Sequence, residues 1–353
     1  MIHRLWLLCV LGFFVALTGC ASPSALTCDT TAPAEALALV AADRIDGALR
    51  DVAQSTRAIG DAYARLKQLP PPPAPAMAMA EMWRQNAFTQ GNTTGFRSWP
   101  PTAERAQLQS QAPYVAFYCY GDSAVSDAAA EDLGDLFWMT PTLRTAYESF
   151  DYSWVYITTV HNAFAIYPYL PMDEAVNNDP PTQQIFYTAA NFDERKVGWT
   201  PPYLDLAGQG MMVTAAYPIY AGDTLLGVAS RDVTIDQMSD TLLAAIAKSS
   251  DAQVLIVDRD GLLIDASDSA LAKWAIEVNT KAKAAVAYCL PAESLKDKAH
   301  LASPAAWANA AVDAVRSSDP DRKTGVIRAQ AAGRAVVAAP IESTGWLLVL
   351  VLP

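Results

Sequence analysis

The chain has 353 residues, of which 52% are hydrophobic and 18% are charged, and its formal net charge is −12. Wholesale disorder is excluded because so apolar a chain can bury packed cores, and the length is sufficient for two domains. A nucleic-acid partner is also excluded, since phosphates would need a basic face.

Residues 1–19 form a predicted signal peptide. A basic start precedes an apolar run over residues 5–17, which is shorter than the ~20 residues of a membrane-spanning helix. The run ends in Leu-Thr-Gly-Cys at residues 17–20, which resembles the lipobox of bacterial lipoproteins. The resemblance implies diacylation (palmitate) at Cys20 and a lipid anchor on the periplasmic side of the envelope. Ala21 favours the outer membrane. The alternative is an ordinary signal peptide with a chance cysteine.

The rest of the chain shows no further membrane span and no metal-binding pattern. Cys28, Cys119 and Cys289 permit at most one intramolecular disulfide, for which Cys28–Cys119 is the candidate pair. No two of these cysteines have the C-x-x-C spacing of a zinc site. We therefore expect no metal and no other cofactor.

A long helix is predicted over residues 36–75, after a lipidated tether over residues 20–35. Apolar side chains recur at spacings of four and three, which places them on one helix face, and the proline-rich stretch from Pro70 to Pro75 ends the helix. A coiled-coil seam would share this pattern over more heptads, so we favour one helix lying along two domains. The stripe consists of Ile45, Leu49, Val52, Thr56, Ile59, Tyr63 and Leu66.

Residues 76–240 are predicted to form an α+β module. Residues 76–125 indicate no clear element, and residues 126–150 are helical. Two β-rich runs on either side of His161 and Asn162 favour a hairpin, and a short helix follows. The later strands are "VGWTPPYLD", "GMMVTAAYPIY" and "TLLGVASRDVTI".

Residues 241–353 repeat this order in a smaller module, which the helix "DQMSDTLLAAIAKSS" joins to the first. A hairpin is predicted around Asp260-Gly261, then Ala-rich helical sequence, then three strands in a meander. The predicted fold class is therefore α+β, with a long N-terminal helix and two modules that each combine an antiparallel sheet with flanking helices.

A family resemblance rests on five segments of the first module. Together they resemble the double Cache sensor domain, a PAS-like extracytoplasmic domain of bacterial chemoreceptors and histidine kinases. The resemblance covers roughly residues 36–353 and is specific over 150–240. It implies a membrane-distal, ligand-binding module over 76–240 and a membrane-proximal module over 241–353. The segments are "WVYITTVHNAFAIYPYL", "FYTAANF", "GWTPPYLD", "MVTAAYPIY" and "GVASRDVTIDQM".

The resemblance also implies the residues of a ligand pocket. Family members that bind amino acids line it with an Arg-x-Trp-Tyr run, a Tyr-x-Asp, and an Asp after a Gly-Val. Here the Tyr-x-Asp becomes Tyr203 and Asp205, the last Asp is Asp232, and the run becomes Gln-Ile-Phe-Tyr over 184–187. The expected ligand-binding residues are Tyr156, Gln184, Phe186, Tyr187, Trp199, Tyr203, Asp205 and Asp232.

The missing arginine indicates the kind of ligand. Gln184 cannot clamp a carboxylate as a guanidinium does, unless Arg195 or Arg231 turns inward. Two carboxylates and several aromatic faces suit an amine or another small polar metabolite rather than a standard α-amino acid. The alternatives are that the aromatic residues are ordinary core, and that Asp205 and Asp232 only cap a turn and a helix.

No catalytic motif is present, so the protein is not expected to be an enzyme. His161 is expected in a hairpin and His300 on the surface, and the aspartates near Asp260 lack the glycine position and final Glu of a calcium loop. A hydrolase using Asp205 and Asp232 stays as a minor alternative. The expected function is a lipid-anchored ligand sensor that signals, if at all, through a separate signalling or transport protein, because the chain shows no signalling domain of its own. The alternative is a structural or assembly lipoprotein with a degenerate pocket.

Overall fold

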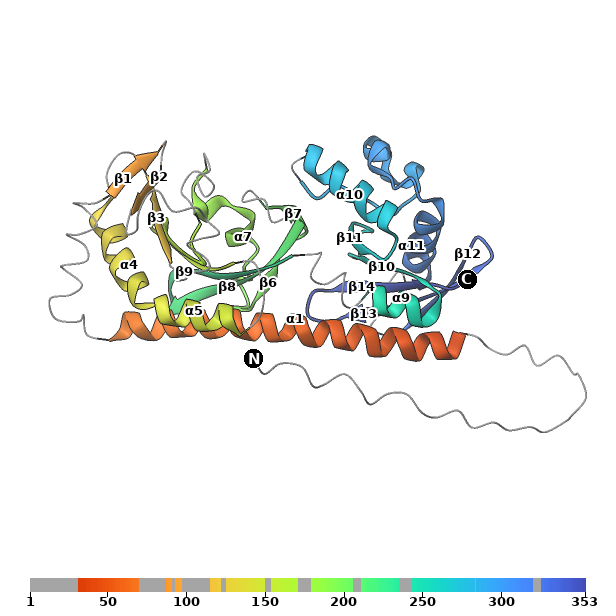
Figure 1. The fold of residues 1–353 in the computed structure, drawn as a ribbon, viewed down its shortest axis with the longest axis horizontal. Coiled ribbons are helices and arrows are strands. Elements are labelled where there is room, and N and C mark those ends of the chain that lie inside the picture. Colours follow the sequence, from red (N-terminus) through yellow and green to blue (C-terminus); the bar gives the residue numbers. More distant parts are fainter. Residues whose placement is uncertain are drawn as a thin grey trace, which may run out of the picture.

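The computed structural model contains two antiparallel sheets that lie along one long helix, as the predicted fold class requires (Figure 1). The predicted signal peptide, Cys20, Cys28 and the proline-rich stretch Pro70–Pro75 lie outside the residues that the structure describes. The described residues are 31–69, 87–90, 93–96, 115–121, 125–149, 154–170, 179–205, 211–234, 243–282, 284–319 and 325–353.

The long helix is α1, Thr31–Gln68, and it buries the predicted stripe. It begins before residue 36, because Pro33 is tolerated in a first helical turn and the alanines that follow favour the helix. Its N-terminal half packs against strands of both sheets, whereas Ile59 and Tyr63 pack only in the first module. The apolar face thus continues along both modules, which explains the length of the helix.

The first sheet has the strand order β1-β2-β3-β5-β4-β9-β8-β6, with β7 also paired to β8. The helices α4 and α5 cover the same face as α1, and the short α7 covers the other. The strands are β1 Ala87–Gln90, β2 Thr93–Phe96, β3 Ala116–Tyr120, β4 Val155–Thr159, β5 Ala163–Tyr167, β6 Gly198–Trp199, β7 Tyr203–Leu204, β8 Met211–Ala221 and β9 Thr224–Thr234; the helices are α4 Asp127–Trp138, α5 Thr140–Glu148, the 3-10 helix η1 Pro181–Gln183 and α7 Ile185–Thr188.

The predicted helix over 126–150 is two helices in the structure. Ser126 caps α4 by accepting a hydrogen bond from the Ala129 amide, and the chain breaks at Met139 before α5. Pro141 lies in the first turn of α5, where its missing N–H is harmless but its ring excludes a continuous helix. The predicted hairpin of β4 and β5 is confirmed, with Asn162 at positive φ in its turn.

The second sheet has the order β11-β10-β14-β13-β12, and the predicted hairpin and meander are both present. At Gly261, φ is +85° and a Cβ atom would lie 2.7 Å from Leu290 Cγ, so the turn requires glycine. The elements are α9 Ala244–Ser250, β10 Gln253–Val257, β11 Leu263–Ala266, α10 Ser269–Ala282, η3 Ala292–Leu301, α11 Ala306–Ser318, β12 Ile327–Ala331, β13 Arg334–Ile341 and β14 Trp346–Val351.

The two modules share one hydrophobic core with α1. Val213 and Ala215 of β8 belong to the same buried cluster as Ile256 of β10 and Trp346 of β14. The Trp346 ring also packs edge-on against Trp199, with 6.3 Å between the ring centroids. Within the described part of the chain, no helix has both the length and the apolar character to cross a bilayer.

Candidate functional site

The candidate site lies on the face of the first sheet that turns away from α1. Side chains alternate between the faces of a strand, so Val213 and Ala215 pack toward α1 while Thr214 points to the opposite side. Asp232 of β9 is directly opposite Thr214 in the ladder and shares its face. Tyr156 of β4 and Tyr203 of β7 also reach this point. Four strands therefore place polar side chains around Asp232.

Asp232 is the centre of a buried hydrogen-bond network. Its Oδ1 accepts hydrogen bonds from the Tyr156 hydroxyl at 2.9 Å and the Thr214 hydroxyl at 2.6 Å. The Tyr203 hydroxyl lies 3.4 Å from the same oxygen and 2.6 Å from Thr214 Oγ1. Because the Thr214 proton is donated to Asp232, Tyr203 is the donor to Thr214. The carboxylate is thus held by hydroxyl groups rather than by a cation.

Burial dominates the electrostatics of this network. Asp232 is only 5% exposed, and desolvation raises its pKa to about 7, with Asp205 adding to the rise and the hydroxyl donors opposing it. Burial and the Asp232 charge raise the pKa of both Tyr156 and Tyr203, which therefore stay protonated donors. The site holds a carboxyl group that changes charge near neutral pH.

Aromatic rings surround the hydroxyl of Tyr156. Its ring packs edge-on against Phe186 of α7, at 5.2 Å between centroids, and it is tilted against Phe164 of β5, at 5.3 Å. The Ser230 hydroxyl of β9 donates to the Phe186 carbonyl oxygen at 3.2 Å and so ties α7 to the sheet. Asp232 therefore has an aromatic neighbourhood on the α7 side.

Three other predicted site residues make no hydrogen bond to Asp232 in the described part of the chain. Asp205 follows β7 and is half-buried, and its charge acts on Asp232. Gln184 is the N-cap of α7, where its carbonyl oxygen accepts the Tyr187 amide at 3.0 Å. Tyr187 packs farther along the same face, against Ala216, and burial raises its pKa to about 12.

Trp199, by contrast, is not brought to Asp232. It is paired with Ala215 in the ladder, so its side chain lies on the α1 face and packs against Trp346 of the second module. The structure therefore places Trp199 on the face of the sheet opposite to Asp232, because the two-residue alternation of the strand turns it away.

Neither candidate arginine turns inward. Arg195 is exposed, where it donates to Asp223 Oδ1 at 2.8 Å and lies over the Tyr220 ring. Arg231 is completely buried on the α1 face, where it donates to Ser55 Oγ and to the Ala146 carbonyl oxygen, each at 2.6 Å. Neither arginine is therefore placed to pair with a ligand carboxylate at Asp232.

Two residues of the network were missed from the sequence. Thr214 contacts Asp232 directly, and Thr200 Oγ1 accepts the Thr214 amide at 2.8 Å. The sequence could have indicated Thr214 through the hairpin of β8 and β9, whose turn lies at Gly222-Asp223. A plain hairpin would have placed Val213 opposite Asp232, but a bulge at Ile219/Tyr220 shifts the register by one residue.

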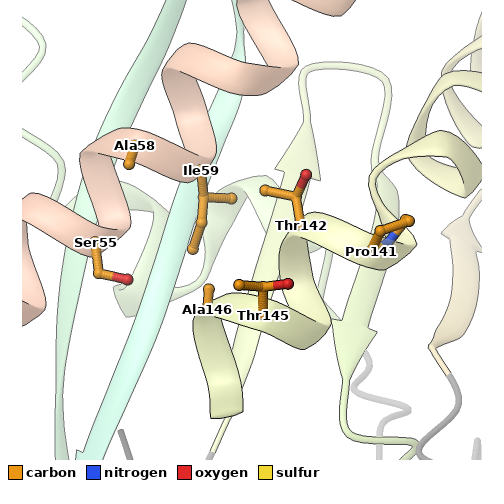
Figure 2. A pocket seen from close by; sticks show the side chains of 7 residues that line it. All are labelled: Ser55, Ala58, Ile59, Pro141, Thr142, Thr145 and Ala146. Carbon is orange, nitrogen blue, oxygen red and sulfur yellow. The ribbon is translucent and has the colours of Figure 1, made fainter. Parts of the chain in front are cut away.

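A groove of about 400 Å³ lies on the α1 face, between α1 and α5 (Figure 2). Its lining side chains are small or apolar and hold no titratable group. The buried guanidinium of Arg231 donates hydrogen bonds to two of the lining residues, Ser55 and Ala146. It is separate from the Asp232 network, which occupies the other face of the sheet. The groove is lined by Ser55, Ala58, Ile59, Pro141, Thr142, Thr145 and Ala146.

Other polar groups of the first module have structural partners. His161 lies in the β4–β5 turn, as predicted, with Nδ1 2.8 Å from Asp132 Oδ2, and Lys67 bridges Asp132 and Asp135. Cys119 and Cys289 are buried free thiols, and Cys28, the other cysteine of the candidate disulfide, lies outside the described residues. Among the described residues, no cluster of His, Cys, Asp or Glu could hold a metal ion.

Comparison with known proteins supports a sensor fold. Residues 123–240 match the family model described as methyl-accepting chemotaxis protein-like, first PDC sensor domain. No match was found among curated protein sequences.

Three of the solved structures that match this chain are ligand-binding domains of chemoreceptors. The ligand-binding domain of the Pseudomonas fluorescens chemoreceptor CtaA, in complex with L-isoleucine, is 15% identical, with a TM-score of 0.48 and 92% of each chain covered. That of Campylobacter jejuni Tlp3, in complex with 4-methylisoleucine, is 11% identical, with a TM-score of 0.49 and coverage of 91% of this chain and 90% of that one. That of Pseudomonas aeruginosa PAO1 PctB, in complex with L-Arg, is 16% identical, with a TM-score of 0.36 and coverage of 64% and 78%. Residues 123–240 therefore resemble a first PDC sensor domain, and a second antiparallel module follows on the same long helix.

Proposed function

We propose that this protein is a non-catalytic, extracytoplasmic sensor that binds a protonated amine, or another small polar ligand with a cationic group, at Asp232. The observation that carries the proposal is the Asp232 network, in which a buried carboxylate accepts the Tyr156 and Thr214 hydroxyls and Tyr203 supports Thr214. A buried carboxylate is costly unless a positive charge compensates it, so a cationic ligand would be stabilised there.

The surroundings favour the same ligand class. Phe186 and Tyr156 offer aromatic faces, which attract a desolvated cation. The arginine that the family resemblance predicts is replaced by Gln184, and Arg195 and Arg231 are engaged elsewhere. A ligand carboxylate would therefore gain little at this site, whereas an ammonium group would gain a charge partner.

Two further parts of the proposal concern the setting of the site. Lipid at Cys20 would anchor the protein to the membrane, and loss of palmitate labelling in a Cys20→Ser variant, but not in Cys9→Ser, checks it. A signal would pass to a separate signalling or transport protein. The alternative function, a structural or assembly lipoprotein, keeps the fold without a ligand.

Thermal-shift titration of the detergent-solubilised full-length protein tests the proposal. Ethylamine and trimethylamine at pH 8 are expected to raise the melting temperature by mass action, and L-isoleucine is expected to raise it less. Asp232→Asn should abolish the amine shift, because it removes the charge that pairs with the ligand.

The matched control is Asp223→Asn, which removes an exposed carboxylate outside the network and should leave the shift unchanged. A shift with amino acids alone would contradict the amine class. The absence of any shift across a broad panel of metabolites would favour the structural lipoprotein.

A further inference from the structure

The hydroxyl donors around Asp232 all reach the same carboxylate oxygen. Tyr156, Thr214 and, at longer range, Tyr203 are directed to Oδ1. Within the described part of the chain, no hydrogen bond reaches Oδ2. The two oxygens of this carboxylate are therefore unequal: Oδ1 accepts the hydroxyl donors, and Oδ2 has no hydrogen-bond partner among the described residues.

Thr214 has the central place among these donors. It makes the shortest bond to Oδ1, at 2.6 Å, and it accepts the Tyr203 hydroxyl at the same distance. Its own amide is fixed by Thr200 Oγ1, and Thr214 is fully buried. The Tyr203 hydroxyl thus acts on Asp232 chiefly through Thr214. Because a threonine side chain is stiff at χ1, the direction of its hydroxyl is set by the strand.

We propose that Thr214 is a positioning residue that occupies Oδ1 together with the two tyrosines, leaves Oδ2 as the single open acceptor of Asp232, and so selects ligands whose cationic nitrogen carries at least one N–H bond. This inference deepens the proposed function and rests on Asp232 being the ligand site. A quaternary ammonium ion carries the same charge, but it cannot donate a hydrogen bond, and it leaves a buried oxygen unsatisfied.

The charge of Asp232 adds a dependence on pH. Burial raises the pKa of Asp232 to about 7, and the Thr214 hydroxyl opposes this rise because it stabilises the ionised form. Among the described residues, the other titratable groups that act on the carboxyl are Tyr156 on β4, Tyr203 on β7 and Asp205 after β7. Loss of the Thr214 hydroxyl would therefore leave Asp232 more protonated at neutral pH and less able to hold a cation.

The role of Thr214 is tested without any ligand by carbon-13 NMR titration of the Asp232 carboxyl group in the full-length protein. The resonance is assigned from its absence in Asp232→Asn. Thr214→Val keeps the side-chain shape and removes the hydroxyl, so the Asp232 pKa should rise, whereas Thr214→Ser should restore a value near that of the wild type. An Asp232 pKa that is equal in Thr214→Val and Thr214→Ser would overturn the role of Thr214.

The ligand class is tested with trimethylammonium and tetramethylammonium chlorides, which differ only in replacement of one N–H by a methyl group. Calorimetry should show binding of trimethylammonium at least about tenfold tighter. Thr214→Val should weaken it about fivefold at pH 7 and little at pH 9, where Asp232 is ionised in both proteins.

Equal affinity for the two ions would overturn the selection of N–H donors. If the wild type binds neither ion, both the ligand class and the proposed function fail. The NMR titration separates the two results, because it still decides whether Thr214 controls the charge of Asp232.

Discussion

At the scale of single residues, Asp232 is a carboxyl group in an apolar setting with neutral donors. The Tyr156 and Thr214 hydroxyls satisfy one of its oxygens, but they do not remove the cost of burying a charge. Its pKa of about 7 expresses that remaining cost. Because its charge is costly to bury, Asp232 should bind a cation well, and it should also make the stability of the folded protein depend on pH.

The stability of the wild-type protein should therefore fall, relative to Asp232→Asn, as pH rises from 4 to 8. The pKa of Asp232 in the folded state lies above its pKa in the unfolded chain. Between the two pKa values the folded state binds more protons than the unfolded chain, so stability is lost as the pH rises through this range. The loss should reach about 4 kcal/mol in the free energy of unfolding. Urea denaturation at several pH values measures it.

Asp223→Asn serves as the comparison, since its carboxylate is exposed in the wild type. A constant difference between the wild type and Asp232→Asn across this pH range would show that Asp232 is not strained in the folded state.

At the scale of elements, the position of α1 against the first sheet depends on a close contact at Gly60. A Cβ atom there would lie 2.6 Å from Tyr217 Cδ1 of β8, whereas a Cβ at Gly47 on the same helix would meet nothing within 4 Å. Gly60 therefore lies tightly against β8 whereas Gly47 faces no neighbour, and the two glycines form a matched pair.

Gly60→Ala should destabilise the protein by about 1–3 kcal/mol, because the added methyl group displaces the Tyr217 ring. Gly47→Ala should stabilise it by about 0.5–1 kcal/mol, because alanine favours the helix and meets no neighbour. Melting temperatures of the two variants check both signs. A gain in Gly60→Ala equal to that of Gly47→Ala would show that the contact between α1 and β8 is loose.

At the scale of the whole molecule, the shared core joins the two modules into one cooperative unit. Trp346 is 5% exposed and packs against Trp199 across the boundary between the modules, within the cluster that also includes α1. The face of β8 and β9 that forms this boundary is the reverse side of the strands that carry Thr214 and Asp232.

Trp346→Ala should lower the stability of both modules together, by about 3–5 kcal/mol, because a large buried ring leaves a cavity. Calorimetry should record a single unfolding transition at a lower temperature. Trp138→Ala is the control, since Trp138 is 43% exposed and its loss should have a small effect. Two separate transitions in the wild type would show that the modules unfold independently.

Most elements followed from local patterns in the sequence. The apolar stripe of α1, the hairpin of β4 and β5, and the meander of β12 to β14 all depend on the spacing of neighbouring side chains, which the sequence shows directly. The strands β1 to β3 did not follow, because short runs such as "AFYCY" carry no period that separates strand from helix.

The sequence by itself determined the long helix, most strands after residue 150 and the presence of a carboxylate at Asp232. Only the tertiary structure decided which side chains meet that carboxylate. One bulge in the hairpin of β8 and β9 places Thr214 rather than Val213 opposite Asp232, and the pairing of β6 with β8 turns Trp199 to the other face. The physical reason is that a strand alternates every residue, so a shift of one in a distant pairing reverses every face, and no local pattern records it.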